Sequence, residues 1–353
     1  MKPLNVAVIG AGSISDLHLK SYQKNQQAAI VAICDINEGR ARAKAAEYGI
    51  ERVYTDYHKL LEDREVESVS ICTWNNLHAQ IAMDALRSGK NVLVEKPLSR
   101  TLEEALQLQQ IVKETGGLLQ VGFVRRYASN TEILNRFIQA GELGEIYYSR
   151  VSCLRRLGNP GGWFADVERS GGGPLIDLGV HIIDIAWYLM GRPKVKSISG
   201  NTYLKLGNRS NIQNLSFYQA SDYDTSRNTV EDFANALIRF ENGASMTVDV
   251  SYTLHAKEDE LIVKLYGEKG GAEIEPELAI VSEKYDTILN VTPQVDNRGL
   301  DFVEAFQNEI NHFVGCSQNH TESRSPVDDG VEIMKMLVGI YESAQKGTEI
   351  YFD

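Results

Sequence analysis

Short, wholly apolar runs alternate with helical segments over the first third of this sequence. The apolar runs lie at 6–9, 30–34, 69–73, 91–94 and 118–121. The helical segments between them lie at 15–25, 38–48, 77–88 and 101–115. A strand without polar residues is buried on both faces, and strands that alternate with helices form parallel βαβ units with right-handed crossovers. The pattern therefore predicts an α/β fold whose first domain, residues 1–122, contains a doubly wound parallel sheet.

The pattern changes after residue 122. A helix is predicted at 129–140, and later segments alternate apolar and polar residues, at 145–155, 195–204, 230–240, 244–253, 261–267 and 271–275. Turn sequences at Asn242-Gly243 and at Gly267–Gly270 predict two hairpins, and adjacent hairpins form an antiparallel sheet. Two more helices are predicted near 301–314 and 328–345, and the polar stretch 205–228 is predicted to be a loop. Residues 123–353 should form a second α/β domain whose sheet has one face covered and the other available to a partner.

The net charge of −12 and the spacing of the cysteines restrict the partners and the compartment. An anionic surface repels phosphate backbones, and no block of lysine and arginine offsets it, so nucleic acid is not expected as a partner. The four cysteines are far apart and form no Cys-x-x-Cys pair, which is typical of a reduced protein. The first apolar run is too short for a signal peptide, and no run reaches the length of a membrane span. We therefore expect a cytoplasmic protein without a membrane partner.

A glycine-rich loop, Gly10-Ala11-Gly12-Ser13-Ile14-Ser15, follows the first predicted strand and opens a helix. In dinucleotide-binding Rossmann domains such glycines allow a tight turn and a close approach of the backbone to the pyrophosphate, which meets the helix N-terminus. Ser15 replaces the third glycine and is small enough for close packing of the helix. Gly10, Gly12, Ser13 and Ile14 are therefore predicted to bind a dinucleotide. The alternative is a glycine-rich turn without a ligand.

The residue that ends the second apolar run is Asp35. A carboxylate at this place bonds the adenosine ribose hydroxyl groups, and it would repel a 2′-phosphate. Ile36 and Asn37 supply no cation, so NAD is predicted in preference to NADP. Arg40 and Arg42 lie further along the next helix, from which they could reach inward. The alternative is that Asp35 only caps that helix.

The third and fourth predicted strands also end in polar residues. The predicted cofactor contacts at these two ends are Thr73, Trp74, Asn75, His78, Glu95 and Lys96. Open α/β sheets bind ligands at the carboxyl ends of their strands, which is where these residues lie. Lys96 is the most informative of them, because a lysine between a carboxylate and a proline at a strand end is held in place.

Four segments together resemble the Gfo/Idh/MocA oxidoreductases, which include glucose–fructose oxidoreductase and inositol 2-dehydrogenase. They are the glycine loop with Asp35, the Glu95-Lys96-Pro97 motif, Gly122–Tyr127 and Gly171–Asp184. The last segment is similar to the family signature Gly-Gly-x-x-x-x-Asp-x-Gly-x-His-x-x-Asp. The similarity covers essentially the whole chain, with the motifs in the order of the family. It implies a Rossmann domain followed by an α/β domain built on a large, mostly antiparallel sheet.

The resemblance also implies roles for individual residues. Lys96 matches the catalytic lysine of the family, and Asp177 and His181 match its helix aspartate and histidine. The peptide bond between the lysine and Pro97 is often cis in these proteins. Trp74 stands where the family usually has a proline, which leaves the shape of this loop open and places an indole near the nicotinamide. Relatives commonly associate through their C-terminal sheets, so a homodimer or homotetramer is expected.

The residues of the signature favour the same chemistry by themselves. Asp177 and His181 are four residues apart and share one helix face, which Asp184 extends, and Pro174 suits the first helical turn. A buried face with these groups is costly unless they are used, and oxidation of a hydroxyl group needs a general base. A structural histidine and a metal site are the alternatives. Because no further ligands are evident, no metal is predicted.

Several residues before and within the signature are candidates for contact with a substrate. The predicted set is Arg126, Arg155, Asn159, Trp163, Asp177 and His181. Trp163 and Phe164 follow Gly161-Gly162 and either wall the pocket or belong to the core. Arg126, Arg155 and Arg156 leave an acidic substrate open, and Tyr252 and His255 are weaker candidates.

The predicted activity is oxidation of a secondary hydroxyl group of a sugar or cyclic polyol by hydride transfer to NAD. His181 takes the hydroxyl proton and Lys96 stabilises the developing oxyanion. One alternative is an NAD-dependent glycosidase on the same fold, which would hold its cofactor without net redox change. The other is a nucleotide-sensing regulator, against which the intact Lys96, Asp177 and His181 argue.

Overall fold

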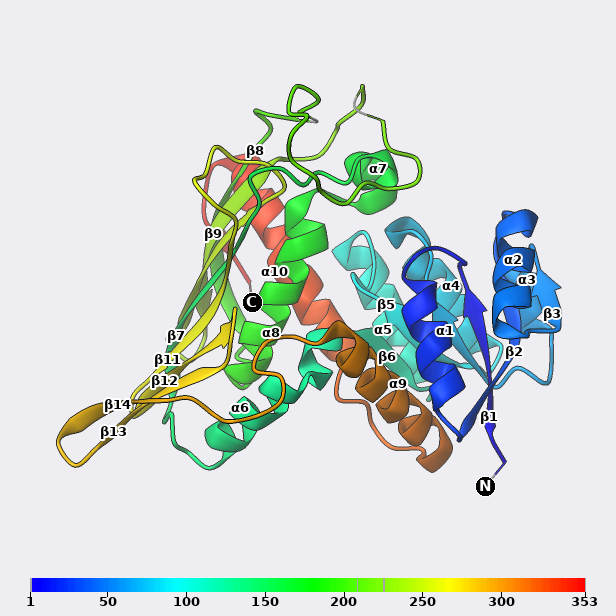
Figure 1. Cartoon of the computed structure of the whole chain (residues 1–353), viewed down its shortest axis with the longest axis horizontal. Helices are drawn as coiled ribbons and strands as arrows, with labels where there is room; N and C mark the ends of the chain where they lie inside the picture. The colour runs from blue at the N-terminus through cyan, green and yellow to red at the C-terminus, as the bar shows by residue number, and fades with distance from the viewer. Residues whose placement is uncertain (1, 208, 225, 353) are drawn as a thin grey trace. The chain divides into compact units, whose positions relative to one another are not determined.

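The computed structural model describes residues 2–207, 209–224 and 226–352 (Figure 1). The chain forms two compact units. The first unit comprises the chain up to Tyr127 and, later in the sequence, Phe302–Met334. The second unit comprises Ala128–Asp301 and the chain from Lys335 onward. The expected boundary after residue 122 lies near the first crossing, but the return of the chain to the first unit was not predicted.

The first unit contains a parallel sheet of six strands in the order β3-β2-β1-β4-β5-β6. Its strands are β1 (Leu4–Ile9), β2 (Ala28–Cys34), β3 (Arg52–Tyr54), β4 (Ser68–Ile71), β5 (Asn91–Glu95) and β6 (Leu119–Gly122). The strand order reverses between β1 and β4, as it does in doubly wound sheets, so the predicted Rossmann-type sheet is confirmed. The three-residue strand β3 and the short helix α3 (Tyr57–Leu61) were not predicted, because neither is long enough to give a periodic pattern.

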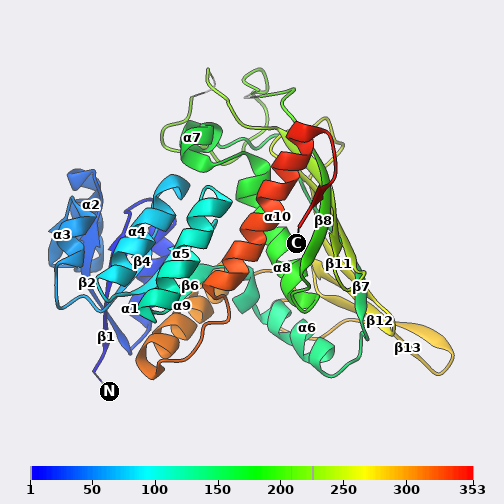
Figure 2. The same ribbon diagram turned by 180° about the vertical axis from the view of Figure 1, so that it is seen from behind.

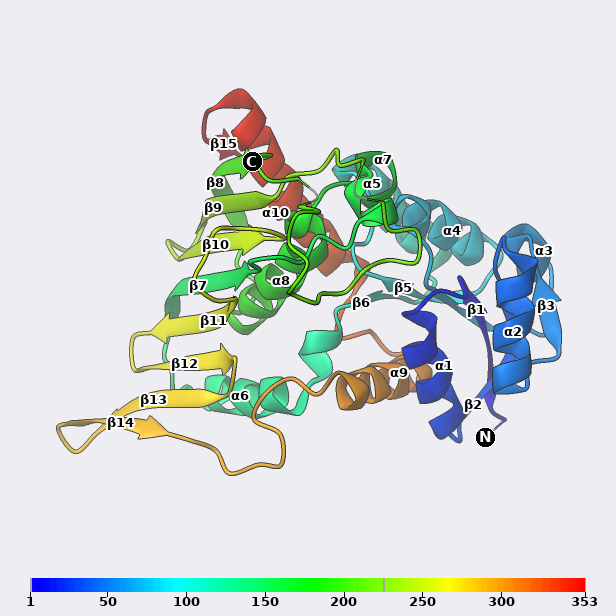
Figure 3. The ribbon, with the colours of Figure 1, turned by 45° about the horizontal axis from the view of Figure 1, so that its top comes forward.

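Helices cover both faces of this sheet (Figure 3). They are α1 (Ser15–Lys24), α2 (Glu38–Tyr48), α4 (Asn75–Arg87), α5 (Leu102–Thr115) and α9 (Phe302–Asn319). Helices α4 and α5 pack side by side on one face, and Figure 2 shows them from their outer side. Helices α1 and α9 pack together on the other face.

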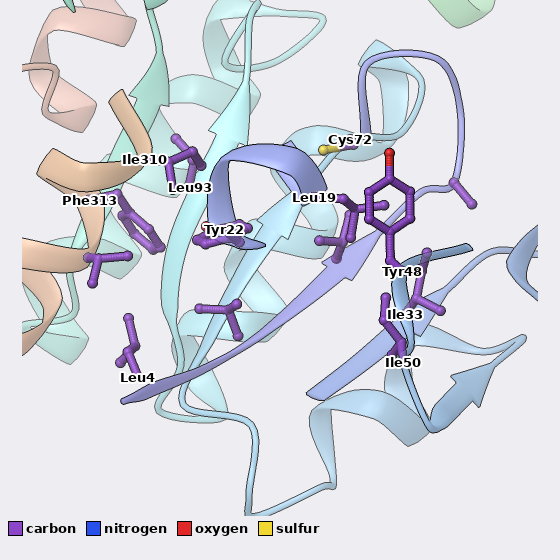
Figure 4. Packing of buried hydrophobic residues seen from close by; sticks show 14 of the residues in the cluster. Leu4, Leu19, Tyr22, Ile33, Tyr48, Ile50, Cys72, Leu93, Ile310 and Phe313 are labelled. Atoms are coloured by element: carbon purple, nitrogen blue, oxygen red, sulfur yellow. The ribbon is translucent and has the colours of Figure 1, made fainter. Parts of the chain in front are cut away.

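The contact between α1 and α9 explains why the chain returns to the first unit. Leu19 and Tyr22 of α1 and Ile310 and Phe313 of α9 are fully buried in one hydrophobic cluster with the strands (Figure 4). Each large apolar side chain buried in this way contributes about 1.5–3 kcal/mol. The apolar stripe of α9 is therefore buried against the sheet of the first unit, although α9 begins 278 residues after the end of α1.

The second unit contains a sheet of nine strands in the order β14-β13-β12-β11-β7-β10-β9-β8-β15. The strands are β7 (Ile146–Leu154), β8 (Val195–Tyr203), β9 (Phe233–Phe240), β10 (Ser245–Ser251), β11 (Glu260–Gly267), β12 (Gly270–Glu275), β13 (Ala279–Lys284), β14 (Thr287–Val291) and β15 (Ile350–Tyr351). Only the β7–β10 pair is parallel among the strand pairs of this sheet in the described residues. Both predicted hairpins are present, as β9–β10 and β11–β12. Strands β13 and β14 were not predicted, because β14 is largely exposed and has no apolar face to reveal it.

Helices of the second unit lie on one face of the nine-stranded sheet (Figures 1 and 3). They are α6 (Ser129–Gln139), α8 (Val180–Leu189) and the C-terminal part of α10 (Val327–Lys346). On the opposite face the described residues place no helix, and this surface is named the open face below. It carries Arg150 of β7, Leu237 of β9 and Thr247 and Asp249 of β10, all at least partly exposed. In the described part of the chain, no helix is long and apolar enough to cross a membrane.

Candidate functional site

The glycine loop between β1 and α1 has the geometry that a dinucleotide needs. Gly10 has φ +99°, and a Cβ atom there would lie 2.4 Å from the carbonyl oxygen of Cys72, so only glycine fits. At Gly12, by contrast, an added Cβ would meet no described atom within 4 Å. Helix α1 follows without a side-chain cap at Ile14, while the Ser15 hydroxyl donates to the Gly12 carbonyl at 2.6 Å. The loop thus presents an open backbone and an uncapped helix N-terminus, which suit a pyrophosphate.

Asp35 lies at the end of β2, beside this loop. Its carboxylate accepts hydrogen bonds from the backbone N–H of Ala11 and of Asn37, both at 2.8 Å, and from the Arg40 guanidinium at 3.1 Å. These bonds fix the orientation of the carboxylate. Oδ1 accepts from both Asn37 and Arg40, whereas Oδ2 accepts only from Ala11 and keeps a further lone pair for a ribose hydroxyl group. Arg40 reaches inward, as the sequence allowed, whereas Arg42 pairs with Glu38 on the surface. The residues therefore fit the adenosine half of NAD.

The ends of β4 and β5 carry two of the predicted cofactor contacts in a different role. His78 is buried, and its ring lies between the carbonyl oxygens of Pro97 at 2.7 Å and Thr73 at 3.1 Å. Glu95 is also buried and accepts a hydrogen bond from Nε2 of His18 at 2.8 Å. Both side chains therefore support the strand ends, and their contact with the cofactor stays a prediction.

The other residues at these strand ends differ in exposure. Thr73, Trp74 and Lys96 are partly exposed, and Asn75 is buried at the first position of α4. The Lys96–Pro97 peptide bond is cis, as the resemblance implied. Partly exposed groups at the carboxyl end of a parallel sheet remain available to a ligand.

The Gly171–Asp184 signature begins α8 in the second unit. It forms a π-helical turn, Leu175–Gly179, that runs directly into α8, with Pro174 at its N-terminal end. Asp177 and His181 are partly exposed, whereas Asp184 is buried. The first two can meet a substrate, and Asp184 is placed in the interior.

Side chains from distant strands and helices hold this signature, and sequence reasoning missed most of them. Glu231, just before β9, accepts hydrogen bonds from the N–H groups of Gly173 at 2.9 Å and Leu175 at 3.1 Å, and from the Tyr341 hydroxyl at 2.8 Å. Burial raises the pKa of Glu231 above its usual range, although these donors oppose the shift. Gly173 is required here because a Cβ atom would lie 2.5 Å from the Glu231 carbonyl oxygen. The only signal in the sequence was a pair of acidic residues before an apolar strand.

Tyr252, a weak candidate in the sequence, lies directly against the signature. It is fully buried, and its hydroxyl donates to Oδ2 of Asp177 at 3.1 Å. Burial, and then the charge of Asp177, raise the pKa of Tyr252 well above its usual range. The phenol therefore stays protonated and orients the Asp177 carboxylate as a hydrogen-bond donor.

Two of the predicted substrate contacts are used inside the protein. Arg126 is fully buried, with an ion pair to Asp329 and a hydrogen bond to the Arg324 carbonyl at 2.9 Å. The side chain of Asn159 is buried and bonds the Gly161 N–H at 2.9 Å and the Asn228 amide at 3.2 Å. Both side chains therefore have partners inside the protein, and their contact with a substrate stays a prediction.

The remaining candidates keep exposed surface. Arg155 and Trp163 are both partly exposed, so the interpretation of Trp163 as core is not supported. Trp163 and Phe164 lie in a short 3-10 helix, Gly162–Ala165, and the centroids of their rings are 3.9 Å apart. Paired aromatic faces of this kind can pack against the C–H groups of a sugar ring.

Two further features bear on ligands. Among the described residues, no group of three or more His, Cys, Asp and Glu side chains could hold a metal ion. A hollow of about 520 Å³ lies along β8, β9 and β10 and includes Leu237, Thr247 and Asp249 of the open face. None of the predicted site residues lines it, so we assign it to the open face of the sheet.

Comparison with known proteins places both units. Residues 4–123 match the model of an oxidoreductase family with an NAD-binding Rossmann fold, and residues 132–273 match a GFO/IDH/MocA C-terminal domain. D-glucoside 3-dehydrogenase of Escherichia coli is 33% identical, covering 99% of this chain and 97% of its own length. The NAD⁺-dependent scyllo-inositol 2-dehydrogenase of Bacillus subtilis is 32% identical, covering 95% and 91%. Levoglucosan dehydrogenase in complex with NADH and levoglucosan shares the fold, with a TM-score of 0.86, 23% identity and 99% coverage of both chains.

Proposed function

Because the chain belongs to the Gfo/Idh/MocA oxidoreductase family, we propose that it is an NAD-dependent dehydrogenase that oxidises a secondary hydroxyl group of a sugar or cyclic polyol. The observation that carries the proposal is the pair Asp177 and His181, which are both partly exposed where the π-helical turn runs into α8, with the Asp177 carboxylate oriented by the Tyr252 hydroxyl. A proton-transfer group fixed in this way is what hydroxyl oxidation requires.

Bound NAD supplies the hydride acceptor. In the second unit, His181 takes the proton of the hydroxyl group, and Asp177 orients the imidazole or relays its proton. In the first unit, the Lys96 ammonium stabilises negative charge on the same oxygen. A fixed positive group stabilises the negative charge that develops in the transition state more strongly when water is excluded from the site.

The adenosine half of the cofactor is held by the glycine loop and Asp35. We propose that NAD is preferred over NADP, because the Asp35 carboxylate would face a 2′-phosphate with like charge. Arg40 does not reverse this preference, since its guanidinium is already paired with Asp35.

A D-glucoside is the first substrate to test. The support is the similarity to D-glucoside 3-dehydrogenase, which extends over 99% of this chain at 33% identity. An inositol is the second, since scyllo-inositol 2-dehydrogenase is 32% identical over 95% of the chain. Trp163 and Phe164 offer an aromatic surface to either ring.

The experiment is a panel of cyclic substrates scored by the appearance of reduced cofactor. It comprises a methyl glucoside, scyllo-inositol, myo-inositol and levoglucosan, with propan-2-ol as an acyclic control. We expect turnover of at least one ring and none of propan-2-ol. Release of free sugar from the glucoside without net NADH would instead support the glycosidase alternative, and tight NAD binding without any chemistry would support the regulator.

We also propose that the protein is a homodimer or homotetramer joined through the open face of the nine-stranded sheet. The open face contains partly buried groups such as Leu237 and Asp249 without a covering helix in the described residues. Burial already raises the pKa of Asp249 above its usual range, although Arg150 opposes the shift. A broad sheet face of this composition is suited to a second copy of the chain.

A further inference from the structure

The residues on either side of Lys96, the proposed catalytic lysine, each form a hydrogen bond with a buried histidine. Glu95 precedes Lys96 and is bound by His18 of α1. Pro97 follows Lys96, and its carbonyl oxygen is bound by His78 of α4. The two helices lie on opposite faces of the parallel sheet (Figure 3), so the Lys96 backbone is tied to both layers of the first unit.

The bond between His18 and Glu95 is well shielded from water. The Nε2 atom of His18 lies 2.8 Å from Oε1 of Glu95, and the two side chains are 0% and 8% exposed. The other carboxylate oxygen, Oε2, accepts the backbone N–H of Lys96 at 3.3 Å. The result is a continuous path from the His18 ring through the carboxylate to the backbone of the lysine.

His18 has no other polar function among the described residues. Its Nδ1 atom is buried without a hydrogen-bond partner there, and its ring lies 5.5 Å from that of Phe306 on α9. Burying an imidazole costs free energy unless its hydrogen bonds are made. Leucine would suit this apolar environment better if packing were the only requirement, so the single bond to Glu95 is the reason for a histidine.

The neighbouring strand keeps the Glu95 carboxylate in place. A Cβ atom at Gly122 of β6 would lie 3.2 Å from the Cα and 3.3 Å from Oε2 of Glu95, so the glycine permits this close packing. Burial by itself raises the pKa of Glu95, but the His18 hydrogen bond and the charges of Lys96 and His78 lower it below its usual range. The group is therefore an ionised carboxylate at neutral pH, and it attracts the ammonium group of the next residue.

We propose that His18 is a positioning residue for Lys96 and acts through Glu95, with His78 holding the other side of the lysine. The inference rests on the proposed catalytic role of Lys96. A displacement of about 1 Å at a reacting group can lower a rate by about 10²-fold, which is the scale on which such support matters.

The test compares His18→Leu with His18→Gln, whose amide nitrogen can replace Nε2 as the donor to Glu95. The matched control is Leu60→Ala, which removes a fully buried side chain of the first unit at α3. We expect His18→Leu to lower kcat by about 10–100-fold with NAD affinity nearly unchanged. The primary kinetic isotope effect with substrate deuterated at the oxidised carbon should rise, because hydride transfer becomes slower relative to the other steps. His18→Gln should recover most of kcat, and Leu60→Ala should change only stability.

Three results would overturn the inference. They are a normal kcat in folded His18→Leu, equal losses in the leucine and glutamine variants, and an equal loss of kcat in Leu60→Ala. If His18→Leu does not fold, Glu95→Gln takes its place, and it should lower kcat in the same way. Lys96→Met is measured in parallel: if it keeps turnover, the proposed role of Lys96 fails, whereas an inactive Lys96→Met with a normal His18→Leu refutes only the positioning role.

A second measurement does not need a substrate. The rate at which acetic anhydride labels Lys96, followed by peptide mass spectrometry, reports the surroundings of its amine. It should change in His18→Leu and return toward the wild-type rate in His18→Gln. An unchanged rate in both variants would contradict the inference, whichever substrate the enzyme uses.

Discussion

The two sheets of this protein are buried in different ways. The parallel sheet of the first unit has helices on both faces, whereas the nine-stranded sheet of the second unit has helices on one face and an open face on the other. In the first unit the predicted site residues come from the ends of adjacent strands. In the second unit the predicted catalytic residues, Asp177 and His181, come from the π-helical turn and the start of α8, which distant residues hold. Parallel strands bring their carboxyl ends to one edge by topology alone, while a helix on a one-sided sheet needs specific partners to fix its direction.

A buried glutamate in each unit shows the same difference. Glu95 is held by His18 next to Lys96, and its pKa is lowered, whereas Glu231 has two backbone N–H groups and a phenol as donors, and burial raises its pKa. A nearby positive group stabilises the charged carboxylate more than neutral donors do. In the first unit the Glu95 carboxylate is therefore charged beside Lys96. In the second unit the Glu231 carboxylate holds the backbone N–H groups of the signature by hydrogen bonds. The predictions below test this comparison, from the largest expected effect to the smallest.

The first prediction removes one proposed catalytic group from each unit. Lys96→Met and His181→Ala should each lower turnover by at least about 10²-fold, because each removes a positioned group from the transition state. NAD affinity should change little, since the adenosine half is proposed to bind at the glycine loop and Asp35. The effects should not add in the double variant, because both groups act on one oxygen. Steady-state kinetics and calorimetric NAD binding measure both quantities.

Asp177→Asn separates two roles in the same experiment. Its effect should be milder than that of His181→Ala if Asp177 only orients its neighbour, and comparable if it relays the proton. Near-normal turnover in Lys96→Met or His181→Ala would show that the catalytic assignment of that residue is wrong. Loss of NAD binding together with turnover would make the residue structural or cofactor-binding.

The second prediction concerns the open face. Leu237→Arg places a charge in the middle of β9, and an unpaired buried charge in an interface costs about 3–5 kcal/mol. The wild-type protein should scatter light as a dimer or tetramer at micromolar concentration, and the variant should dissociate. Leu106→Arg, on exposed α5 of the first unit, is the matched control and should leave the assembly intact. A monomeric wild-type protein would refute the proposed assembly.

The third prediction concerns the opposite pKa shifts of the two glutamates. The ordinary value for both is 4.5. A lowered pKa gives Glu95 a stabilising contribution that is present above pH 4.5 and is lost as pH falls through the lowered pKa. A raised pKa gives Glu231 a contribution that is complete below pH 4.5 and declines as pH rises through the raised pKa. The free energy of unfolding is measured across pH for wild type, Glu95→Gln and Glu231→Gln. The difference between wild type and Glu95→Gln should change with pH in the opposite direction to the difference between wild type and Glu231→Gln.

Glu231→Gln should also destabilise the protein by about 1–3 kcal/mol, because an amide NH₂ cannot accept the Gly173 hydrogen bond. Tyr341→Phe is the control, since it removes one donor to Glu231 and leaves both backbone bonds. It should cost less than Glu231→Gln. Parallel slopes for the two glutamine variants would mean that the two carboxylates do not differ as the structure indicates.

The fourth prediction is confined to the first unit. Asp35→Ser should narrow the preference for NAD over NADP by about tenfold, or about 1.4 kcal/mol, because it removes like charge from the 2′ position and releases Arg40. Arg42→Ser, whose guanidinium pairs with Glu38 on the surface, is the control and should leave the ratio unchanged. The ratio of kcat/KM for the two cofactors is the measurement. A wild-type enzyme that prefers NADP would refute the assignment to Asp35.

More of the candidate site could be predicted from the sequence in the first unit than in the second. The places of the glycine loop, Asp35 and Lys96 at strand ends could be predicted because strand order in a βαβ sheet determines which strand ends are neighbours. The support for the signature could not, since Glu231 lies 54 residues beyond Asp177 and Tyr341 lies in α10, near the end of the chain. The buried partners of Arg126 and Asn159 could not be predicted either, because sequence does not show which polar side chains meet in the interior.

By itself, the sequence determined the parallel sheet, the cofactor loop and the two hairpins, because local spacing and periodicity carry that information. Its resemblance to the family singled out Lys96, Asp177 and His181 as the candidate catalytic residues. Only the tertiary structure decided that α9 returns to the first unit, that Tyr252 orients Asp177, and that His18 and His78 hold the residues on either side of Lys96. These are long-range contacts, and their partners are chosen by packing and by the need to satisfy buried polar groups, which no short stretch of sequence records.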